Sequence, residues 1–300
     1  MASRRSGSKG ASSLEYALLV GALVAVAVLV VGAVGQDTEK AIEQAGREAA
    51  PSTTDAVLGA QLERRPAGRP AVWVDPTDPA GSVVVAASQT GGGLTVFDLR
   101  AVAVDEVAGP VAHDVDLRDA FRFGEDGRGA LVVAAGDTGL ATYRLDPASH
   151  RLTAGSTVKA GSIRGVCLHR GPASGEIDAF TYGSGAEVEH WRLTAGGEGS
   201  VEGRRVRVIR LGAPVEACAA DDLHGELLVS ERGTGLWRYP VAADDPTPPV
   251  QVDRVGAGGL VADVDSIAFV DGGAGRGYVV ASSEGDETLT LYHRSGDHAV

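Results

Sequence analysis

The sequence predicts a long apolar helix near the N-terminus followed by an all-β body. Three observations support this fold class: an uncharged apolar run over residues 17–35, a later chain rich in glycine and β-branched residues, and a strand pattern that recurs about every 50 residues. Glycine together with β-branched residues favours short strands joined by tight turns. The formal net charge of −13 argues against a nucleic-acid partner, which would be held by neutralising its phosphates.

The N-terminal apolar run is long enough to cross a bilayer. Its nineteen residues would form a helix of about 28 Å. The small and polar stretch "SGSKGASS" precedes the run, whereas the small-residue cleavage site of a secretory signal peptide follows its apolar core. Glu15 lies at the edge of the run, and an ionised carboxylate there is costly unless a cation compensates it.

The stretch "GASSLEYALLVGALVAVAVLVVGAVG" resembles the small Flp (Tad, type IVb) prepilins. The resemblance implies that prepilin peptidase removes residues 1–10 after Gly10, that Ala11 becomes the new N-terminus, and that Glu15 and Tyr16 serve filament assembly. The new α-amino group and Glu15 would share one face of a helix. The implied partners are further copies of the chain, the peptidase, the pilus assembly machinery and the inner membrane before assembly. The implied location is the bacterial cytoplasmic membrane and then an extracellular pilus.

The chain is therefore expected to contain four parts. A leader peptide covers residues 1–10, and a pilin-like transmembrane or filament-core helix covers residues 11–50. Residues 51–68, which contain Pro, Ser, Thr and Gly with little periodicity, are expected to form a linker. The β body covers residues 69–300.

The β body contains five segments with one plan: an inner run, a strand such as "SVVVAAS", a glycine-containing turn and an aromatic-bearing strand such as "GLTVFDL". A four-stranded propeller blade needs ~40–50 residues, so the pattern predicts a β-propeller with five recognisable four-stranded repeats. The fifth repeat reaches the end of the sequence, and a fragment, a five-bladed ring or two chains that complete one another all stay open. The repeats begin near Ala71, His113, Ile163, Pro214 and Asp263, at spacings of 42, 50, 51 and 49 residues.

The repeats resemble the β-propeller phytases, which are calcium-dependent phosphatases of phytate with six blades. The stretches that carry the resemblance are "RPAVWVDPTDPAGSVVVAASQTGGGLTVFDL", "DVDLRDAF", "VEACAADDLHGELLVSERGTGLWRY" and "ADVDSIAF" with "GYVVASSEG". The similarity is collinear from about Arg69 to the end of the chain. It implies a phytase-type propeller whose sixth blade is absent from this chain, and it implies Ca²⁺ as the cofactor.

The resemblance also implies site residues. Arg118 matches a phosphate-contacting arginine, and four acidic residues match the family's calcium ligands. Ca²⁺ takes six to eight oxygen ligands, so it needs such a cluster of carboxylates. From the residues alone, the acidic side chains could equally stabilise turns and strand ends, and Arg118 could equally neutralise them. The four implied ligands are Glu216, Glu231, Asp263 and Asp265.

The chain departs from the family at several of these chemical positions. Gly68 and Arg69 stand where the family has two aspartates, and residues 88–93 lack the family's lysine. Arg164 replaces a metal-contacting tyrosine, and Glu284 replaces a glutamine. The loss of carboxylates and gain of arginines in the channel disfavours a cluster of several calcium ions.

Cys167 and Cys218 fall on the innermost runs of the third and fourth repeats. A disulfide between neighbouring blades and two separate thiols both fit this placement.

Three functions follow from these patterns. The first is a type IVb pilin subunit that displays a propeller on a surface filament in a structural or adhesive role. The alternatives are a surface-anchored, calcium-dependent phytase-like phosphatase, and a membrane-anchored propeller that binds a partner without polymerising. The sequence assigns no catalytic residue.

Overall fold

A computed structural model describes residues 66–88, 91–124, 127–171, 176–257 and 259–296. The predicted leader, apolar helix and most of the linker lie outside the described residues, so the prepilin-like features are not tested by the structure. No helix in the described part of the chain is long and apolar enough to cross a membrane.

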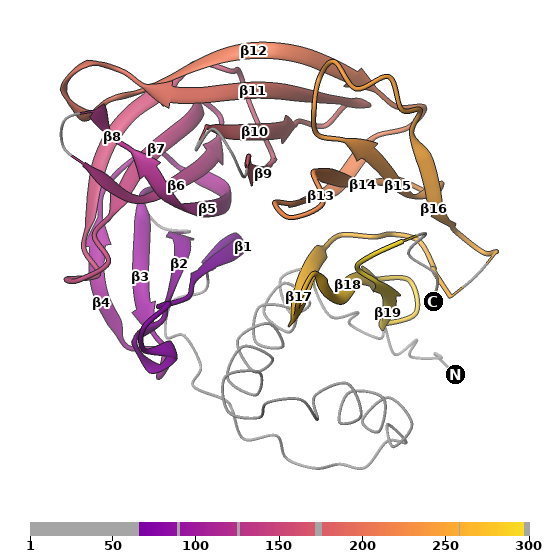
Figure 1. The fold of residues 1–300 in the computed structure, drawn as a ribbon, viewed down its shortest axis with the longest axis horizontal. Coiled ribbons are helices and arrows are strands. Elements are labelled where there is room, and N and C mark those ends of the chain that lie inside the picture. The colour runs from indigo at the N-terminus through magenta and orange to yellow at the C-terminus, as the bar shows by residue number, and fades with distance from the viewer. Residues whose placement is uncertain (1–65, 89–90, 125–126, 172–175, 258, 297–300) are drawn as a thin grey trace, which may run out of the picture.

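The described residues form five antiparallel sheets arranged as the blades of a propeller (Figure 1). Strands β1, β5, β9, β13 and β17 are the innermost strands, and each contacts the next one around the ring. Blades 1 to 4 have four strands each. Blade 1 contains β1 (Pro66–Trp73), β2 (Val83–Ser88), β3 (Leu94–Asp98) and β4 (Ala103–Val107), with a short 3-10 helix η1 (Pro79–Gly81) between β1 and β2; blade 2 contains β5 (Ala112–Arg122), β6 (Arg128–Gly136), β7 (Gly139–Leu145) and β8 (Leu152–Val158).

The chain then continues through the remaining blades in the same way. Blade 3 contains β9 (Gly165–Arg170), β10 (Ile177–Tyr182), β11 (Glu187–Ala195) and β12 (Val201–Arg210), with a short 3-10 helix η3 (Gly197–Gly199) before β12; blade 4 contains β13 (Val215–Asp221), β14 (Glu226–Glu231), β15 (Gly235–Pro240) and β16 (Val250–Arg254); blade 5 contains β17 (Ile267–Gly273), β18 (Arg276–Ser283) and β19 (Thr288–His293).

Blade 5 differs from the predicted four-stranded plan. In the described residues it has three strands, β17, β18 and β19, where the repeat plan predicts four. Directly after β19, Arg294 turns back toward blade 4 and forms an ion pair with Asp221 at 2.7 Å. Ser295 and Gly296 then continue in a bend and a turn.

Glycine begins the third strand in two blades for a steric reason. Gly139 and Gly235 have φ angles of 119° and 145°. A Cβ atom on either residue would meet a carbonyl oxygen of the fourth strand, at 2.2 Å from Val158 and at 2.1 Å from Asp253. These glycines therefore let the third and fourth strands approach each other closely.

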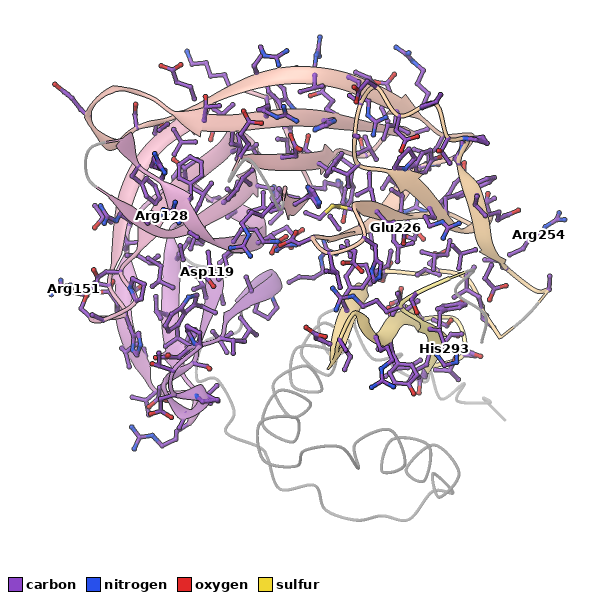
Figure 2. The ribbon with its side chains drawn as sticks, in the orientation of Figure 1. Asp119, Arg128, Arg151, Glu226, Arg254 and His293 are labelled. Carbon is purple, nitrogen blue, oxygen red and sulfur yellow. A yellow bond between two sulfur atoms is a disulfide. The ribbon has the colours of Figure 1, made fainter. Side chains whose placement is uncertain are left out.

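The apolar core lies between successive blades, in four clusters that join blades 1 and 2, 2 and 3, 3 and 4, and 4 and 5. Strand β6 is buried along almost its whole length, because both of its faces are covered by neighbouring blades. Charged side chains such as Arg151 and Arg254 project from the outer circumference (Figure 2). The inner strands thus form a rigid wall around a polar channel.

Candidate functional site

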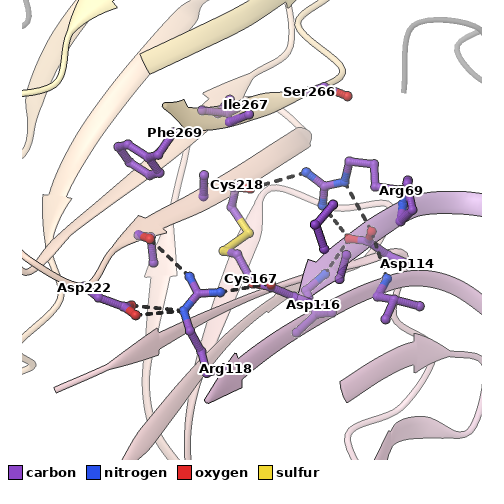
Figure 3. A pocket seen from close by; sticks show the side chains of 18 of the residues that line it. Arg69, Asp114, Asp116, Arg118, Cys167, Cys218, Asp222, Ser266, Ile267 and Phe269 are labelled. Atoms are coloured by element: carbon purple, nitrogen blue, oxygen red, sulfur yellow. Dashed lines mark hydrogen bonds and ion pairs between the residues drawn. A yellow bond between two sulfur atoms is a disulfide. The ribbon is translucent and has the colours of Figure 1, made fainter. Parts of the chain in front are cut away.

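Two pockets with charged side chains lie at the inner strands, and they share no lining residue. The channel pocket has a volume of about 360 Å³, and its charged lining residues are Arg69, Asp114, Asp116, Arg118, Asp222 and Arg294 (Figure 3). The rim pocket has a volume of about 340 Å³, and its lining residues are Arg164, Tyr182, Gly183, Ser184, Pro214, Val215, Glu216, Arg232 and Asp265.

In the channel pocket, Arg69 of β1 forms an ion pair with Asp114 of β5 through two of its nitrogens. It also donates to the carbonyl oxygen of Cys218 at 3.3 Å and to the hydroxyl oxygen of Tyr182 at 3.3 Å. Burial lowers the pKa of Arg69, but the negative charge of Asp114, the hydrogen bond to that carboxylate and the neighbouring Tyr182 and Asp116 together raise that pKa above its usual value. Arg69 therefore acts as the fixed counter-cation of a carboxylate that is 4% exposed.

Arg118, the residue matched to a phosphate contact, is fully engaged inside the protein. Its Nη1 donates to Asp116 at 3.0 Å and its Nε to Asp222 at 3.1 Å. Its Nη1 also donates to the carbonyl oxygen of Leu117 at 2.8 Å, and its Nη2 to that of Ala220 at 3.3 Å. The arginine thus neutralises carboxylates of blades 2 and 4, which was the alternative left open by the sequence.

The channel carboxylates also bind backbone groups of the neighbouring blade. Each accepts a hydrogen bond from a backbone N–H of β9. The three N–H groups belong to every second residue of β9 and therefore lie on the same side of the strand. The bonds run from Val166 to Asp114 at 3.0 Å, from Leu168 to Asp116 at 2.7 Å and from Arg170 to Asp222 at 2.9 Å. These aspartates link the inner strands of different blades, and each also has an arginine partner: Arg69 pairs with Asp114, and Arg118 pairs with both Asp116 and Asp222.

A disulfide covers part of the channel wall. Cys167 of β9 and Cys218 of β13 are joined, with a Cα–Cα distance of 5.9 Å and a sequence separation of 51. It is a covalent link between blades 3 and 4 at the level of the Arg118 network (Figure 3). No free cysteine is present among the described residues.

The rim pocket is built where inner strands begin and middle strands end. Glu216 lies near the start of β13, Arg232 directly follows β14, and Asp265 lies in the loop before β17. The Nε atom of Arg232 donates to Oε1 of Glu216 at 2.5 Å. The backbone N–H of Val264 donates to Oε2 of the same carboxylate at 3.3 Å.

Acidic groups influence each other strongly in this pocket. Burial, a hydrogen bond with Glu284 and the charges of Glu284 and Asp263 raise the pKa of Asp265 to about 6. Burial and the charges of Asp263 and Asp265 also raise the pKa of Glu216, against the effect of Arg232. Glu216, Asp263 and Asp265 act on Arg232, and Glu284 lies beside Asp265. Repulsion among such carboxylates is the condition that a bound cation relieves.

The rim residues fit Ca²⁺ in donor chemistry and charge, but they are not already arranged as a ligand shell. Among the described residues, no three acidic, histidine or cysteine side chains surround a common point in the way that metal ligands do. Arg232 already contacts one oxygen of Glu216, and Asp265 shares a hydrogen bond with Glu284. The guanidinium of Arg232 already places a positive charge beside Glu216. The pocket therefore matches Ca²⁺ in charge and in oxygen donors only.

Glu231, the fourth acidic residue matched to a calcium ligand, does not join this group. Its Oε1 accepts the backbone N–H groups of Gly212 and Ala213, the latter at 2.8 Å, and its Oε2 accepts the indole N–H of Trp237 at 2.8 Å. The side chain thus fixes the turn before β13, as the alternative reading of these residues proposed.

The structure adds site residues that the sequence did not single out as ligands or contacts. Arg232 directly follows Glu231 in the chain. Successive side chains of a strand point to opposite faces, so the side chains of Glu231 and Arg232 have different surroundings. Arg164 lines the rim pocket with an exposed side chain. The only sequence signals were the replacements at Arg164 and Glu284, which mark chemical positions without giving a role.

A propeller whose mouth carries clustered carboxylates and arginines is the class of protein that these features define. The sequence model of the family described as Phytase matches residues 14–300. The chain therefore belongs to the phytase family. It is 27% identical over 241 residues to a protein of Bacillus subtilis (strain 168) named 3-phytase, an alignment that covers 76% of this chain and 62% of that protein. The chain thus spans less than two thirds of that relative's length.

Proposed function

We propose that this protein is a calcium-assisted phosphatase of phosphate monoesters, of phytase type, and that its reaction centre is the rim pocket. The observation that carries the proposal is the presence in one pocket of a carboxylate cluster with Glu216 and Asp265 and of two arginines, Arg164 and Arg232. Membership of the phytase family and the 3-phytase relative support phytate as the substrate class.

The carboxylates would hold the cation. Glu216, Asp263, Asp265 and Glu284 supply oxygen ligands of the kind that Ca²⁺ prefers. When bound, Ca²⁺ supplies positive charge beside the phosphate oxygens and makes water a better nucleophile. The protein's own residues keep the carboxylates in place, since the backbone of Val264 holds Glu216.

The arginines would bind the phosphate group. Arg164 is exposed on the loop before β9, and its backbone N–H is anchored to the carbonyl oxygen of Tyr182 at 2.8 Å. Arg232 is 59% exposed at the opposite wall of the pocket. Two guanidinium groups can hold several oxygens of one phosphate and orient it toward the carboxylate cluster.

Phosphate release tests the proposal. The purified full-length protein would be incubated with phytate in Ca²⁺ or in EGTA, next to Asp265→Asn and the exposed-turn variant Asp245→Asn. We expect release in Ca²⁺, a loss of at least about tenfold in EGTA and in Asp265→Asn, and no loss in Asp245→Asn. An absence of release from phytate and from simple phosphate monoesters in Ca²⁺ would overturn it.

We propose further that the prepilin-like N-terminus displays this propeller at the cell surface. The support is the sequence from Gly10 to Tyr16, with Glu15 at the edge of the apolar run. Processing after Gly10 would place the chain in the bacterial cytoplasmic membrane and then in a filament of further copies, with prepilin peptidase and the assembly machinery as partners.

N-terminal analysis of mechanically sheared surface fibres tests the display, with Gly10→Val as the variant. We expect a chain that starts at Ala11 in the fibres and is lost in the variant. Recovery of the unprocessed chain from membranes alone would contradict filament display and would favour a membrane-anchored propeller.

A further inference from the structure

The buried side-chain nitrogens that lack a hydrogen-bond partner are concentrated in blade 3. In the described part of the chain, every buried side-chain nitrogen or oxygen without such a partner belongs to His169, His190 or Arg207. These residues lie on β9, β11 and β12, which are strands of one sheet. Buried polar atoms in proteins are normally hydrogen-bonded, so their concentration in one blade needs an explanation.

His169 lies in the interface between blades 3 and 4. It is 4% exposed, and both of its ring nitrogens are without a partner in the described residues. It follows Cys167 by two residues in β9, so the two side chains are on the same face of the strand. Cys167 belongs to the apolar cluster that joins blades 3 and 4. His169 is therefore a buried imidazole between two blades.

The carboxylate of Asp178, directly opposite His169 in β10, is engaged by other groups. Its two oxygens accept hydrogen bonds from Arg192 at 2.8 and 3.2 Å. Nε2 of His190 lies 2.9 Å from Oδ1 of Asp178, although not in the direction of a hydrogen bond. Nδ1 of His169 stays 4.0 Å from Oδ2. Asp178 is thus no free acceptor for His169.

Two carboxylates of blade 4, those of Asp221 and Asp222, also act on the His169 ring. Each has an arginine partner and a second donor, so neither is free to accept a hydrogen bond from the imidazole in its present position. The partners are Arg294 and His224 for Asp221, and Arg118 and the backbone N–H of Arg170 for Asp222.

A proton on His169 would add a charge and a second N–H donor where no acceptor is free. Burial lowers the pKa of His169, and the positive charge of Arg118 lowers it too, against the charges of the three aspartates. In the open or unfolded state the ring meets water and has a pKa of about 6.5. Because the pKa in the closed interface is lower, the interface is stable above about pH 6.5 and loses stability as the pH falls below that value.

The disulfide is placed where it can limit an opening of this interface. It joins Cys167 of β9, on the same face as His169, to Cys218 of β13. A covalent link keeps the two inner strands close when the other contacts between the blades are lost, so the opened state has few alternatives and closes again readily.

We propose that His169 is an acid-sensitive switch between blades 3 and 4, whose protonation opens their interface while the Cys167–Cys218 disulfide keeps them joined. The interface closes again when the pH rises. The inference stands apart from the proposed function, since His169 lines neither the channel pocket nor the rim pocket.

Hydrogen exchange followed by mass spectrometry tests the switch. The full-length protein would be compared at pH 7.5 and pH 5.5, with the rates corrected for the intrinsic effect of pH on amide exchange. We expect the opening of β9 and β13 to increase about tenfold at pH 5.5, because that pH is one unit below the pKa of a solvated imidazole. Strand β2 of blade 1 should change by less than about twofold.

Variants assign the effect to one residue. His169→Gln keeps a polar side chain that does not titrate, so we expect its β9 and β13 to change by less than about twofold between the two pH values. His169→Phe removes the unpartnered nitrogens and serves the same purpose if the glutamine variant does not fold. His113→Gln is the matched control and should keep the tenfold change, since His113 is 39% exposed and pairs with Asp137.

The double variant Cys167→Ala with Cys218→Ala tests the role of the disulfide. At pH 5.5 we expect its β9 and β13 to open at least about threefold more than those of the unchanged protein, relative to pH 7.5. Equal acid-induced opening in the two proteins would overturn that role.

Three outcomes would overturn the switch itself. The first is no increase of opening in the unchanged protein at pH 5.5. The second is the same increase in the unchanged protein and in the His169 variants. The third is an increase that is lost in His190→Gln and kept in His169→Gln, which would assign the proton to the other histidine. None of them bears on phosphate release, so the proposed function is tested separately.

Discussion

The channel pocket and the rim pocket contain similar residues but balance their charges differently. In the channel, Asp114 and Asp116 each have an arginine partner and a backbone N–H from β9. At the rim, Arg232 contacts Glu216, while burial and the charges of Asp263 and Asp265 raise the pKa of Glu216. Every channel carboxylate thus has an arginine partner, whereas the rim carboxylates repel one another.

This difference shows that acidic residues in a propeller channel do not by themselves indicate metal sites. Arg69 and Arg118 supply the positive charge that the channel carboxylates need, and they come from strands that also build the wall. A metal site is indicated where carboxylates exceed their built-in cations, as they do around Asp265.

The largest expected effect comes from breaking the channel. Arg69→Met leaves the buried carboxylate of Asp114 without its cation, so we expect a loss of about 3–5 kcal/mol in the free energy of unfolding. Chemical denaturation measures it. Arg100→Met is the control, since Arg100 pairs with Asp98 while 84% exposed, and it should change stability by less than about 0.5 kcal/mol. Equal losses in the two variants would contradict the role of Arg69.

The next effect tests the covalent link in the channel wall. Replacement of Cys167 and Cys218 by alanine removes a disulfide that closes a long loop, whose ends have a sequence separation of 51. We expect a loss of about 3 kcal/mol in unfolding free energy, because the unfolded chain gains freedom. Denaturation of the double variant in non-reducing buffer measures it. A loss below about 1 kcal/mol would show that the apolar cluster and the ionic network hold blades 3 and 4 together without the covalent link.

A third effect is a pH dependence where the two pockets meet. Tyr182 donates to the carbonyl oxygen of Glu216 at 2.8 Å, and burial raises the pKa of its hydroxyl to about 12. The folded state therefore holds this proton more tightly than the unfolded state, whose pKa is about 10. The resulting stability is present below pH 10 and is lost as the pH rises to about 12.

The variant Tyr182→Phe isolates this group. Between pH 10 and pH 12, the stability advantage of the unchanged protein over the variant should shrink by about 2 kcal/mol. Denaturation at several pH values measures it. A constant difference across this range would show that the hydroxyl is not held by its buried position.

The smallest expected effect concerns the charge of Asp265 in the rim pocket. In metal-free protein, Asp265→Asn removes one charge from a repelling group, so we expect unfolding free energy to rise by about 0.5 kcal/mol. Asp222→Asn in the channel should lower it by about 1–2 kcal/mol, because it weakens bonds to Arg118 and to the β9 backbone. Thermal melting in EGTA measures the change in stability of both variants. A change of the same sign in both would contradict the difference between the two pockets.

The sequence predicts much of the fold because each blade repeats one strand plan. The innermost runs, such as the one with Cys167, fall on inner strands as expected. The pairing of Arg294, directly after β19, with Asp221 of β13 could not be predicted, because it joins residues that are far apart in the chain. The repeats could not decide between a disulfide and separate thiols, since that depends on the distance between two strands.

The site was harder to predict than the fold. The resemblance brought Glu216 and Asp265 together, but it could not show that Glu231 turns to a backbone loop and Trp237. Arg232 carried no signal, because its role depends on which face of the strand end meets Glu216. Charge balance is a property of side chains from several blades, so a single motif does not contain it.

Calcium binding by equilibrium dialysis tests the contrast most directly, with the full-length protein, Asp265→Asn and Asp222→Asn measured in parallel. We expect the unchanged protein and Asp222→Asn to bind Ca²⁺ alike, and Asp265→Asn to bind it at least about tenfold more weakly. Loss of binding in Asp222→Asn with full binding in Asp265→Asn would place the ion in the channel and contradict a calcium site at the rim.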